Sequence, residues 1–254
     1  MASAGFLLLA LLRTRLRLLG LPLLVLAFLL SWHAQRKPPA DLLVAEDGAL
    51  VALLGPAVAT NRARPPDFLF DQWQRALRLE QPLAPEVSPS GDIAAILVSD
   101  PPDRLPLDPD QLAQVHTAMR EMARAADEKR GIFHCLPKAW CLAVTTEGAL
   151  VAVMEDGRLT GIGCDLAAVV VAPRARFDEC RSGAFLISGR TLRKTGALEI
   201  HLNGSREPGR WHATAAMSGS DRPWNRHRHY DWRSDSFDAT VPESVSALLS
   251  GSGG

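Results

Sequence analysis

The sequence predicts an α+β protein in which an N-terminal transmembrane helix precedes a β-rich domain. The chain begins with long apolar runs, and short apolar runs separated by turn residues follow them. The 19 glycines and 18 prolines lie in short clusters, which favours a turn-rich fold over a helical bundle. About 190 residues remain between the apolar start and the polar end, which is enough for a hydrophobic core.

The apolar start predicts a membrane segment over residues 1–36, consisting of a partial hairpin and one span. Residues 16–32 would form a helix of roughly 25 Å, slightly short of a hydrocarbon core, with Arg17 snorkelling at one end and Trp32 at the opposite interface. Residues 6–12 are too few to span and resemble the end of an earlier helix. A secretory signal peptide and a buried hairpin are the alternatives. An anchor or a signal peptide would each place the rest of the chain across the membrane.

The remainder predicts a domain over residues 37–233 and a disordered tail over residues 234–254, which are rich in Ser and Gly. Two helices are expected, one over residues 67–79 with Phe68, Trp73 and Leu77 toward a core, and one over residues 110–130 behind an Asp108-Pro109 cap. The strands are expected in a hairpin over residues 37–56 and in the runs 167–172, 183–188 and 197–202. A phrase of the first hairpin, DGALVA, recurs as EGALVA near residue 150, and two hairpins with the same turn chemistry explain it without duplication.

The four cysteines predict two disulfides between nearest neighbours, Cys135–Cys141 and Cys164–Cys180. An even number of cysteines in an oxidising compartment favours bridges. Free thiols are an alternative. A zinc site is another, although these spacings lack the close pairs of structural zinc sites.

The sequence offers no catalytic or metal motif, and no cofactor is expected. His227 and His229 with Asp231 superficially match metal-hydrolase spacing, but no preceding strand would aim them at a metal, and a solvated surface explains them. Serine-hydrolase, zinc-protease and phosphate-loop signatures are missing from the sequence. We therefore expect a protein that is not an enzyme.

Arginine and aromatic residues alternate near the C-terminal end. The chain as a whole has 28 basic and 28 acidic residues, which argues against a purely electrostatic binder of nucleic acid. Residues 206–233 nevertheless hold six arginines against three acidic residues. Proteins that bind single-stranded nucleic acid use arginines to contact phosphates and aromatic rings to stack on bases. The candidate contacts are Arg222, Trp224, Arg226, Arg228 and Trp232. Alternatively, Trp211 and Trp224 pack at the domain edge while the arginines stay solvated.

The order of several phrases resembles the C-terminal region of the ComEC family of competence proteins, of the alphaproteobacterial type. These phrases are LLRTRLRLLGLPLLVLAFLL, PADLLVAEDGALVALLGP, FLFDQWQR, the cysteine pairs, ISGRTLRKTGALEIHL and DRPW. The match covers residues 10–80 and 135–226, so residues 82–134 would be a variable insertion. In other branches of the family this domain resembles a metallo-β-lactamase with an HxHxDH motif, which this sequence lacks.

The resemblance implies a role in DNA uptake. The chain would be a non-enzymatic domain, single-pass or part of a polytopic protein, in the bacterial inner membrane and facing the periplasm. Membrane lipid, a DNA-uptake channel or other competence proteins, and DNA itself are the implied partners. A degenerate metallo-β-lactamase-type hydrolase and a secreted binding module are the alternatives, and the fold could then be a degenerate part of a metallo-β-lactamase-like domain.

Overall fold

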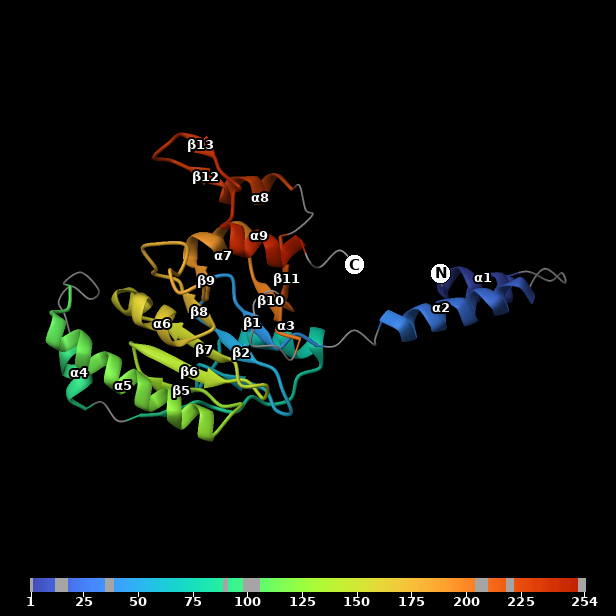
Figure 1. Ribbon diagram of the computed structural model, residues 1–254. Coiled ribbons are helices and arrows are strands. Elements are labelled where there is room, and N and C mark those ends of the chain that lie inside the picture. The colour runs from blue at the N-terminus through green and yellow to red at the C-terminus, as the bar shows by residue number, and fades with distance from the viewer. Residues whose placement is uncertain are drawn as a thin grey trace. The chain divides into compact units, whose positions relative to one another are not determined.

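The computed structural model describes residues 2–11, 18–34, 39–88, 91–97, 106–203, 210–217 and 222–250 (Figure 1). The chain divides into two compact units, Met1–Pro39 and Ala40–Gly254. Among the described residues, the first unit contains two helices and the second contains the strands.

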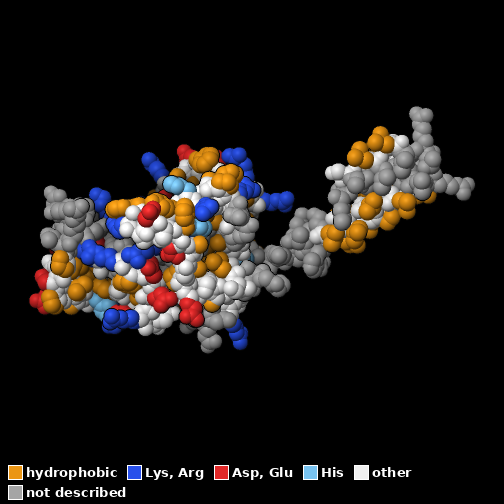
Figure 2. Space-filling view, turned by 90° about the horizontal axis from the view of Figure 1, so that it is seen from above, with side chains coloured by type: hydrophobic (Ala, Val, Ile, Leu, Met, Phe, Trp, Pro, Cys, Tyr) orange, Lys and Arg blue, Asp and Glu red, His pale blue; other side chains and the backbone are white. Residues whose placement is uncertain are grey.

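The N-terminal unit is a pair of apolar helices, α1 (Ala2–Leu11) and α2 (Gly20–Ala34), which contact each other. Hydrophobic side chains gather on the face of the pair that Figure 2 shows, and Phe6, Leu11 and Phe28 are largely exposed. The predicted span over residues 16–32 falls partly outside the described residues. In the described part of the chain, no helix combines the length and apolar character needed to cross a membrane.

The second unit is a β-rich α+β domain built on two main sheets, as the sequence predicts. The first sheet is antiparallel, in the order β11-β10-β1-β2-β3. Its strands are β1 (Leu42–Val44), β2 (Val51–Leu53), β3 (Ala59–Thr60), β10 (Leu198–His201) and β11 (His212–Ala215). The second sheet is mixed, in the order β4-β5-β6-β7-β8-β9. Its strands are β4 (Glu86–Val87), β5 (His134–Leu136), β6 (Trp140–Val144), β7 (Leu150–Met154), β8 (Val169–Ala172) and β9 (Phe185–Ser188).

The two sheets pack face to face, because strands of both sheets send alternate side chains into one shared core. In β8, Val169 and Val171 join the core between the sheets, whereas Val170 and Ala172 join the core on the opposite face. A strand buried on both faces has a continuous apolar sequence, and this explains the run predicted over residues 167–172. The hairpin predicted over residues 37–56 is likewise confirmed as β1 and β2.

Helices cover the outer faces of both sheets, so the domain has the layer order helix, sheet, sheet, helix (Figure 1). The first sheet is covered by α3 (Asp67–Leu77) and the second by α4 (Asp92–Leu97), α5 (Pro109–Glu128) and α6 (Thr160–Leu166), which follows the short 3-10 turn η2 (Gly157–Leu159). In α3 the buried residue is Phe70, and Phe68 is 79% exposed, so the prediction that Phe68 faces a core is wrong.

The N-terminus of α5 confirms the cap predicted from the sequence. The Asp108 carboxylate accepts a hydrogen bond from the Gln111 backbone amide at 2.8 Å, and the Gln111 side chain accepts one from the Asp108 amide at 3.1 Å. This reciprocal pair satisfies two amide donors that a helix start leaves free. Val115 and Met119 are buried against the second sheet. The segment 82–134, expected as a variable insertion, therefore contributes an outer layer of the domain.

Part of the tail predicted to be disordered, over residues 236–250, forms a strand and a helix. After β9 come α7 (Gly189–Thr195), α8 (Pro223–Arg228), the two-stranded pair β12 (Tyr230–Asp231) and β13 (Ser236–Phe237), and α9 (Glu243–Ser250). Val245 and Leu248 of α9 are buried in the core between the sheets. The tail was predicted to be disordered because it is mostly polar, although Val245 and Leu248 have the spacing of one helix face.

Candidate functional site

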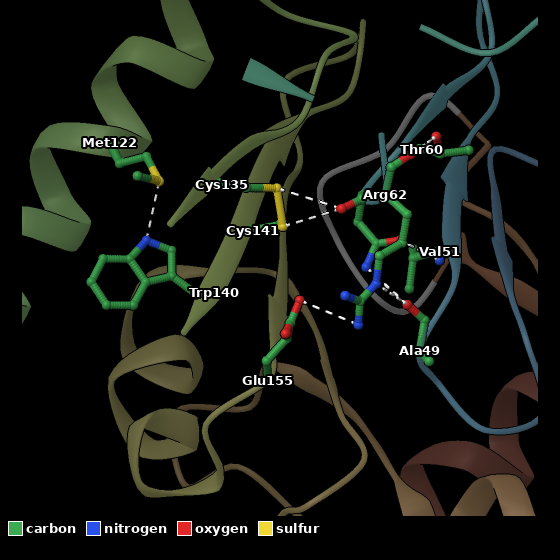
Figure 3. Close-up of a disulfide and its surroundings, with 10 residues drawn as sticks. Ala49, Val51, Thr60, Arg62, Met122, Cys135, Trp140, Cys141 and Glu155 are labelled. Atoms are coloured by element: carbon green, nitrogen blue, oxygen red, sulfur yellow. Dashed lines mark hydrogen bonds and ion pairs between the residues drawn. A yellow bond between two sulfur atoms is a disulfide. The ribbon is translucent and has the colours of Figure 1, made fainter. Parts of the chain in front are cut away.

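The disulfide Cys135–Cys141 joins the facing strands β5 and β6, whose Cα atoms are 4.1 Å apart at this pair (Figure 3). Both residues are buried between the sheets. The carbonyl oxygen of Asn61, which follows β3 of the other sheet, lies 3.7 and 3.6 Å from the two sulfurs. Bridged sulfurs carry no hydrogen, so we treat these as contacts. They bring the disulfide of one sheet against the end of the other.

Asn61 ties this end of the first sheet together. Its buried side chain accepts a hydrogen bond from the Val51 amide at 2.8 Å and donates one to the Ala49 carbonyl at 3.1 Å. The next residue, Arg62, also donates to the Ala49 carbonyl and forms an ion pair with Glu155 at 3.4 Å. The disulfide, the β1–β2 connection and the end of β7 therefore meet at one place.

The second disulfide, Cys164–Cys180, connects α6 to the segment between β8 and β9, with Cα atoms 5.5 Å apart. Both predicted pairings are thus confirmed, and no described cysteine is free. The Ser182 hydroxyl donates a hydrogen bond to the Cys164 carbonyl at 2.6 Å. This bond is a second link between α6 and the segment between β8 and β9.

A cavity of about 920 Å³ lies where strands of both sheets end, and we call it the strand-end cavity. Its wall comes from the β1–β2 turn, from Arg62, from α4, from the β5–β6 turn and from the segments that follow β7 and β8. Its volume is in the range of small-molecule sites.

The acidic groups of this cavity are largely occupied. Asp156 is buried and accepts hydrogen bonds from Arg158 at 2.6 to 3.1 Å, and Arg158 also donates to the Leu97 carbonyl at 2.8 Å. Glu155 is paired with Arg62. A buried charge is tolerated when it is paired and hydrogen-bonded, as here. Asp156 and Glu155 therefore already have partners within the protein and are not free to bind a ligand cation.

Lys138 sits in an unusual backbone conformation at the rim of this cavity. It is the third residue of the turn between β5 and β6, in which the Ala139 amide donates to the Leu136 carbonyl at 3.1 Å. Its φ is 64°, and the preceding residue is Pro137, as in a type II turn, where this position usually holds Gly or Asn. Its side chain is exposed and forms no hydrogen bond or ion pair with the described residues.

A second candidate site is the segment 222–238, which contains α8, β12 and β13 and which we call the Arg/Trp module. Figure 1 shows it projecting from the sandwich beyond α7. Three of its aromatic side chains are mostly exposed, namely Trp224 (65%), Trp232 (69%) and Phe237 (56%). A guanidinium lies over each of these rings, from Arg222, Arg233 and Arg226 respectively, at 4.7 to 5.4 Å from the centroid.

The module is attached to the domain by polar contacts. Arg193 of α7 donates to the carbonyls of Arg228 and Tyr230, both at 2.8 Å. Arg228 in turn donates to the Arg193 carbonyl at 3.0 Å and forms an ion pair with Glu46 at 2.8 Å. Arg228 thus holds the module in place.

The structure brings together four of the five residues predicted to contact nucleic acid. Arg222, Trp224, Arg226 and Trp232 lie on the module with exposed side chains, whereas Arg228 is engaged as described. The alternative interpretation has both Trp211 and Trp224 packing at the domain edge. Trp211 is buried in the core between the sheets, whereas Trp224 is mostly exposed.

The two histidines of the HxH sequence do not share a site. His227 is exposed on α8, and His229 lies within 3.4 Å of the Lys194 carbonyl. Among the described residues, His, Cys, Asp and Glu side chains form no group of three arranged to hold a metal ion.

Sequence reasoning missed the strand-end cavity, because its residues come from turns far apart in the chain. One signal was present. Two acidic turns, Glu46-Asp47-Gly48 and Glu155-Asp156-Gly157, each follow an apolar run, and the structure places both at this cavity.

No protein-family model, no curated protein and no solved structure matches the chain.

Proposed function

We propose that this chain is a membrane-anchored, non-enzymatic extracytoplasmic domain of a ComEC-like competence protein, associated with DNA uptake across the bacterial inner membrane. The observation that carries the proposal is the combination of two disulfides in one domain with a pair of apolar helices before it. Disulfides persist in compartments such as the periplasm. The resemblance of the ordered sequence phrases to the ComEC C-terminal region supplies the link to DNA uptake.

The helices α1 and α2 are the proposed membrane anchor. Both are apolar on all sides, which is typical of a helix in lipid or in a protein core. The 15 residues of α2 correspond to about 22 Å, which is shorter than a bilayer core of about 30 Å. Local thinning of the bilayer and snorkelling of flanking side chains accommodate a short apolar segment.

The topology is tested by labelling intact cells with a membrane-impermeant thiol reagent, with and without prior reduction. We expect labelling only after reduction, because both disulfides are closed and cutting the second one frees the half-buried Cys180 on the periplasmic side. A variant with all four cysteines changed to serine is the control and stays unlabelled. Labelling that needs permeabilised cells would place the domain in the cytoplasm and refute the proposal.

The role in uptake is tested by natural transformation. Deleting the coding sequence in its native host lowers the transformation frequency if the protein serves the uptake channel. An unchanged frequency in a host that is naturally transformable would refute this part of the proposal while leaving the membrane topology standing.

A degenerate metallo-β-lactamase-type hydrolase is the second candidate, and the layer order of the domain favours it. Such domains are also built as helix, sheet, sheet, helix, with their site at the strand ends, where the strand-end cavity lies. Stoichiometric zinc in protein purified without chelator would support this candidate. Protein without zinc would count against it.

A further inference from the structure

The Arg/Trp module has exposed apolar side chains and no core of its own. None of the residues in α8, β12 and β13 is buried, and an isolated two-stranded hairpin is marginally stable in water. Trp224, Trp232 and Phe237 are all mostly exposed on this one projecting segment, and we call them the aromatic patch. Exposed aromatic groups gathered on one small element mark an interaction surface.

The chemistry of this patch matches the boundary between lipid headgroups and acyl chains. Indole and phenol rings concentrate at this boundary, since they combine an apolar body with one polar group. Arginine side chains at this boundary supply a cationic group that attracts lipid phosphate while the rest of the side chain stays with apolar groups. The three arginine–aromatic pairs of the module provide this combination within one segment.

The charge of the module favours lipid over nucleic acid as its partner. It contains four arginines and three aspartates, a formal net charge of +1. Arg228 is already paired with Glu46, and Asp231 and Asp235 lie in the hairpin next to the exposed rings. Binding to nucleic acid depends on neutralising many phosphates. Insertion of aromatic rings into an interface requires no such excess of positive charge.

We infer that the Arg/Trp module is a peripheral membrane contact, which places Trp224, Trp232 and Phe237 in the headgroup region of a phospholipid bilayer. The inference rests on the proposed membrane location, because an anchored domain meets the bilayer at high effective concentration. Arg193 and Arg228 fix the module on α7, so the aromatic patch is presented in a defined orientation.

The test uses residues 40–254, because the apolar helices would bind lipid on their own and would mask the module. This fragment comprises a compact unit with its own core between the sheets and both disulfides. Binding is measured by flotation with phosphatidylcholine vesicles, with and without phosphatidylglycerol, and by quenching of tryptophan fluorescence by brominated lipid. We expect binding and quenching with the wild-type fragment, and stronger binding when phosphatidylglycerol is present.

The decisive variant is Trp224→Ser/Trp232→Ser. We expect its vesicle affinity to fall about tenfold or more, because two interfacial rings are lost. The matched control is Phe68→Ser, which removes an aromatic ring at least as exposed from α3 and should change the affinity less than about twofold. Thermal unfolding of each variant confirms that the fold is kept.

Two outcomes would overturn the inference. One is wild-type fragment that neither floats with vesicles nor is quenched by brominated lipid. The other is binding to a short single-stranded oligonucleotide, lost in the double tryptophan variant, together with vesicle binding that this variant leaves unchanged. Either result leaves the thiol-labelling test of membrane topology unaffected, so failure of this inference is distinguishable from failure of the proposed function.

Discussion

At the scale of single residues, the backbone that follows β8 is closely packed against glycines. Three glycines from different segments face Pro173 and Arg174 there. A Cβ atom added to Gly189 would lie 2.3 Å from the Pro173 carbonyl oxygen, and one added to Gly157 would lie 2.5 Å from the Arg174 carbonyl oxygen. Since the obstacle in both cases is backbone, a side chain cannot turn aside to make room. This packing fixes the segment that lines the strand-end cavity.

We therefore expect Gly189→Ala to destabilise the domain by about 2 kcal/mol, the usual cost of forcing extra atoms into a packed interior. Urea denaturation followed by tryptophan fluorescence measures the change. The control is Gly161→Ala in α6, where an added Cβ meets nothing within 4 Å, and helix propensity should raise its stability by up to about 1 kcal/mol. Equal stabilities for the two variants would contradict the packing described here.

At the scale of elements, α7 links the sandwich to the Arg/Trp module through charged contacts. Lys194 of α7 forms an ion pair with Asp238 at 2.7 Å and donates to the Thr240 carbonyl at 2.5 Å. The hydrogen bond from the Lys194 ammonium, with a further one from the Thr240 amide, lowers the pKa of Asp238 from 3.8 to about 2. The contact is therefore at full strength at neutral pH.

Because the folded state lowers the pKa of Asp238, this contact stabilises the attachment above about pH 4 and is lost as the pH falls toward 2. We expect Lys194→Met to return the pKa of Asp238 toward 3.8. A carboxyl-detected NMR titration measures it. The control Lys138→Met removes a lysine at the strand-end cavity and should leave the pKa of Asp238 unchanged. A pKa near the ordinary value in the unaltered protein would contradict the ion pair.

The elements themselves were predicted well where one physical signal dominates. The continuous apolar run Val169–Ala172 predicts a strand buried on both faces, and the pair Asp108-Pro109 predicts the start of a helix. Prediction failed where two faces compete. In a helix as short as α3, Phe68 and Phe70 lie on different sides, and only packing against the first sheet decides which one is buried. The cavity could not be predicted, because Arg62, Glu155 and Arg174 meet only through the pairing of the sheets.

At the scale of the whole molecule, the two disulfides act on different connections. Cys135 and Cys141 are separated by 6 positions and join strands that the β5–β6 ladder already holds. Cys164 and Cys180 are separated by 16 positions and tie α6 across β8 to the segment before β9. The entropy that a crosslink removes from the unfolded chain grows with the length of the closed loop. The second bridge should therefore contribute more to stability.

We expect the double variant Cys164→Ala/Cys180→Ala to lose about 3 kcal/mol of unfolding free energy, as the loop-closure model gives for this length. Urea denaturation under non-reducing conditions measures the loss. The neighbouring exposed residue provides the control, since Arg181→Ala should change stability by less than about 0.5 kcal/mol. A variant as stable as the wild type would show that the bridge adds nothing to the fold.

The polar attachment of the Arg/Trp module has a consequence for how the domain opens. Releasing the module breaks hydrogen bonds to α7 and the ion pair with Glu46, and the module itself has no buried side chain to expose, because α8, β12 and β13 contribute none to the core. Its opening free energy is therefore a local quantity, separate from the cooperative unfolding of the sandwich. We therefore expect the module to detach at a lower free energy than the sandwich needs to unfold, although both parts belong to one domain.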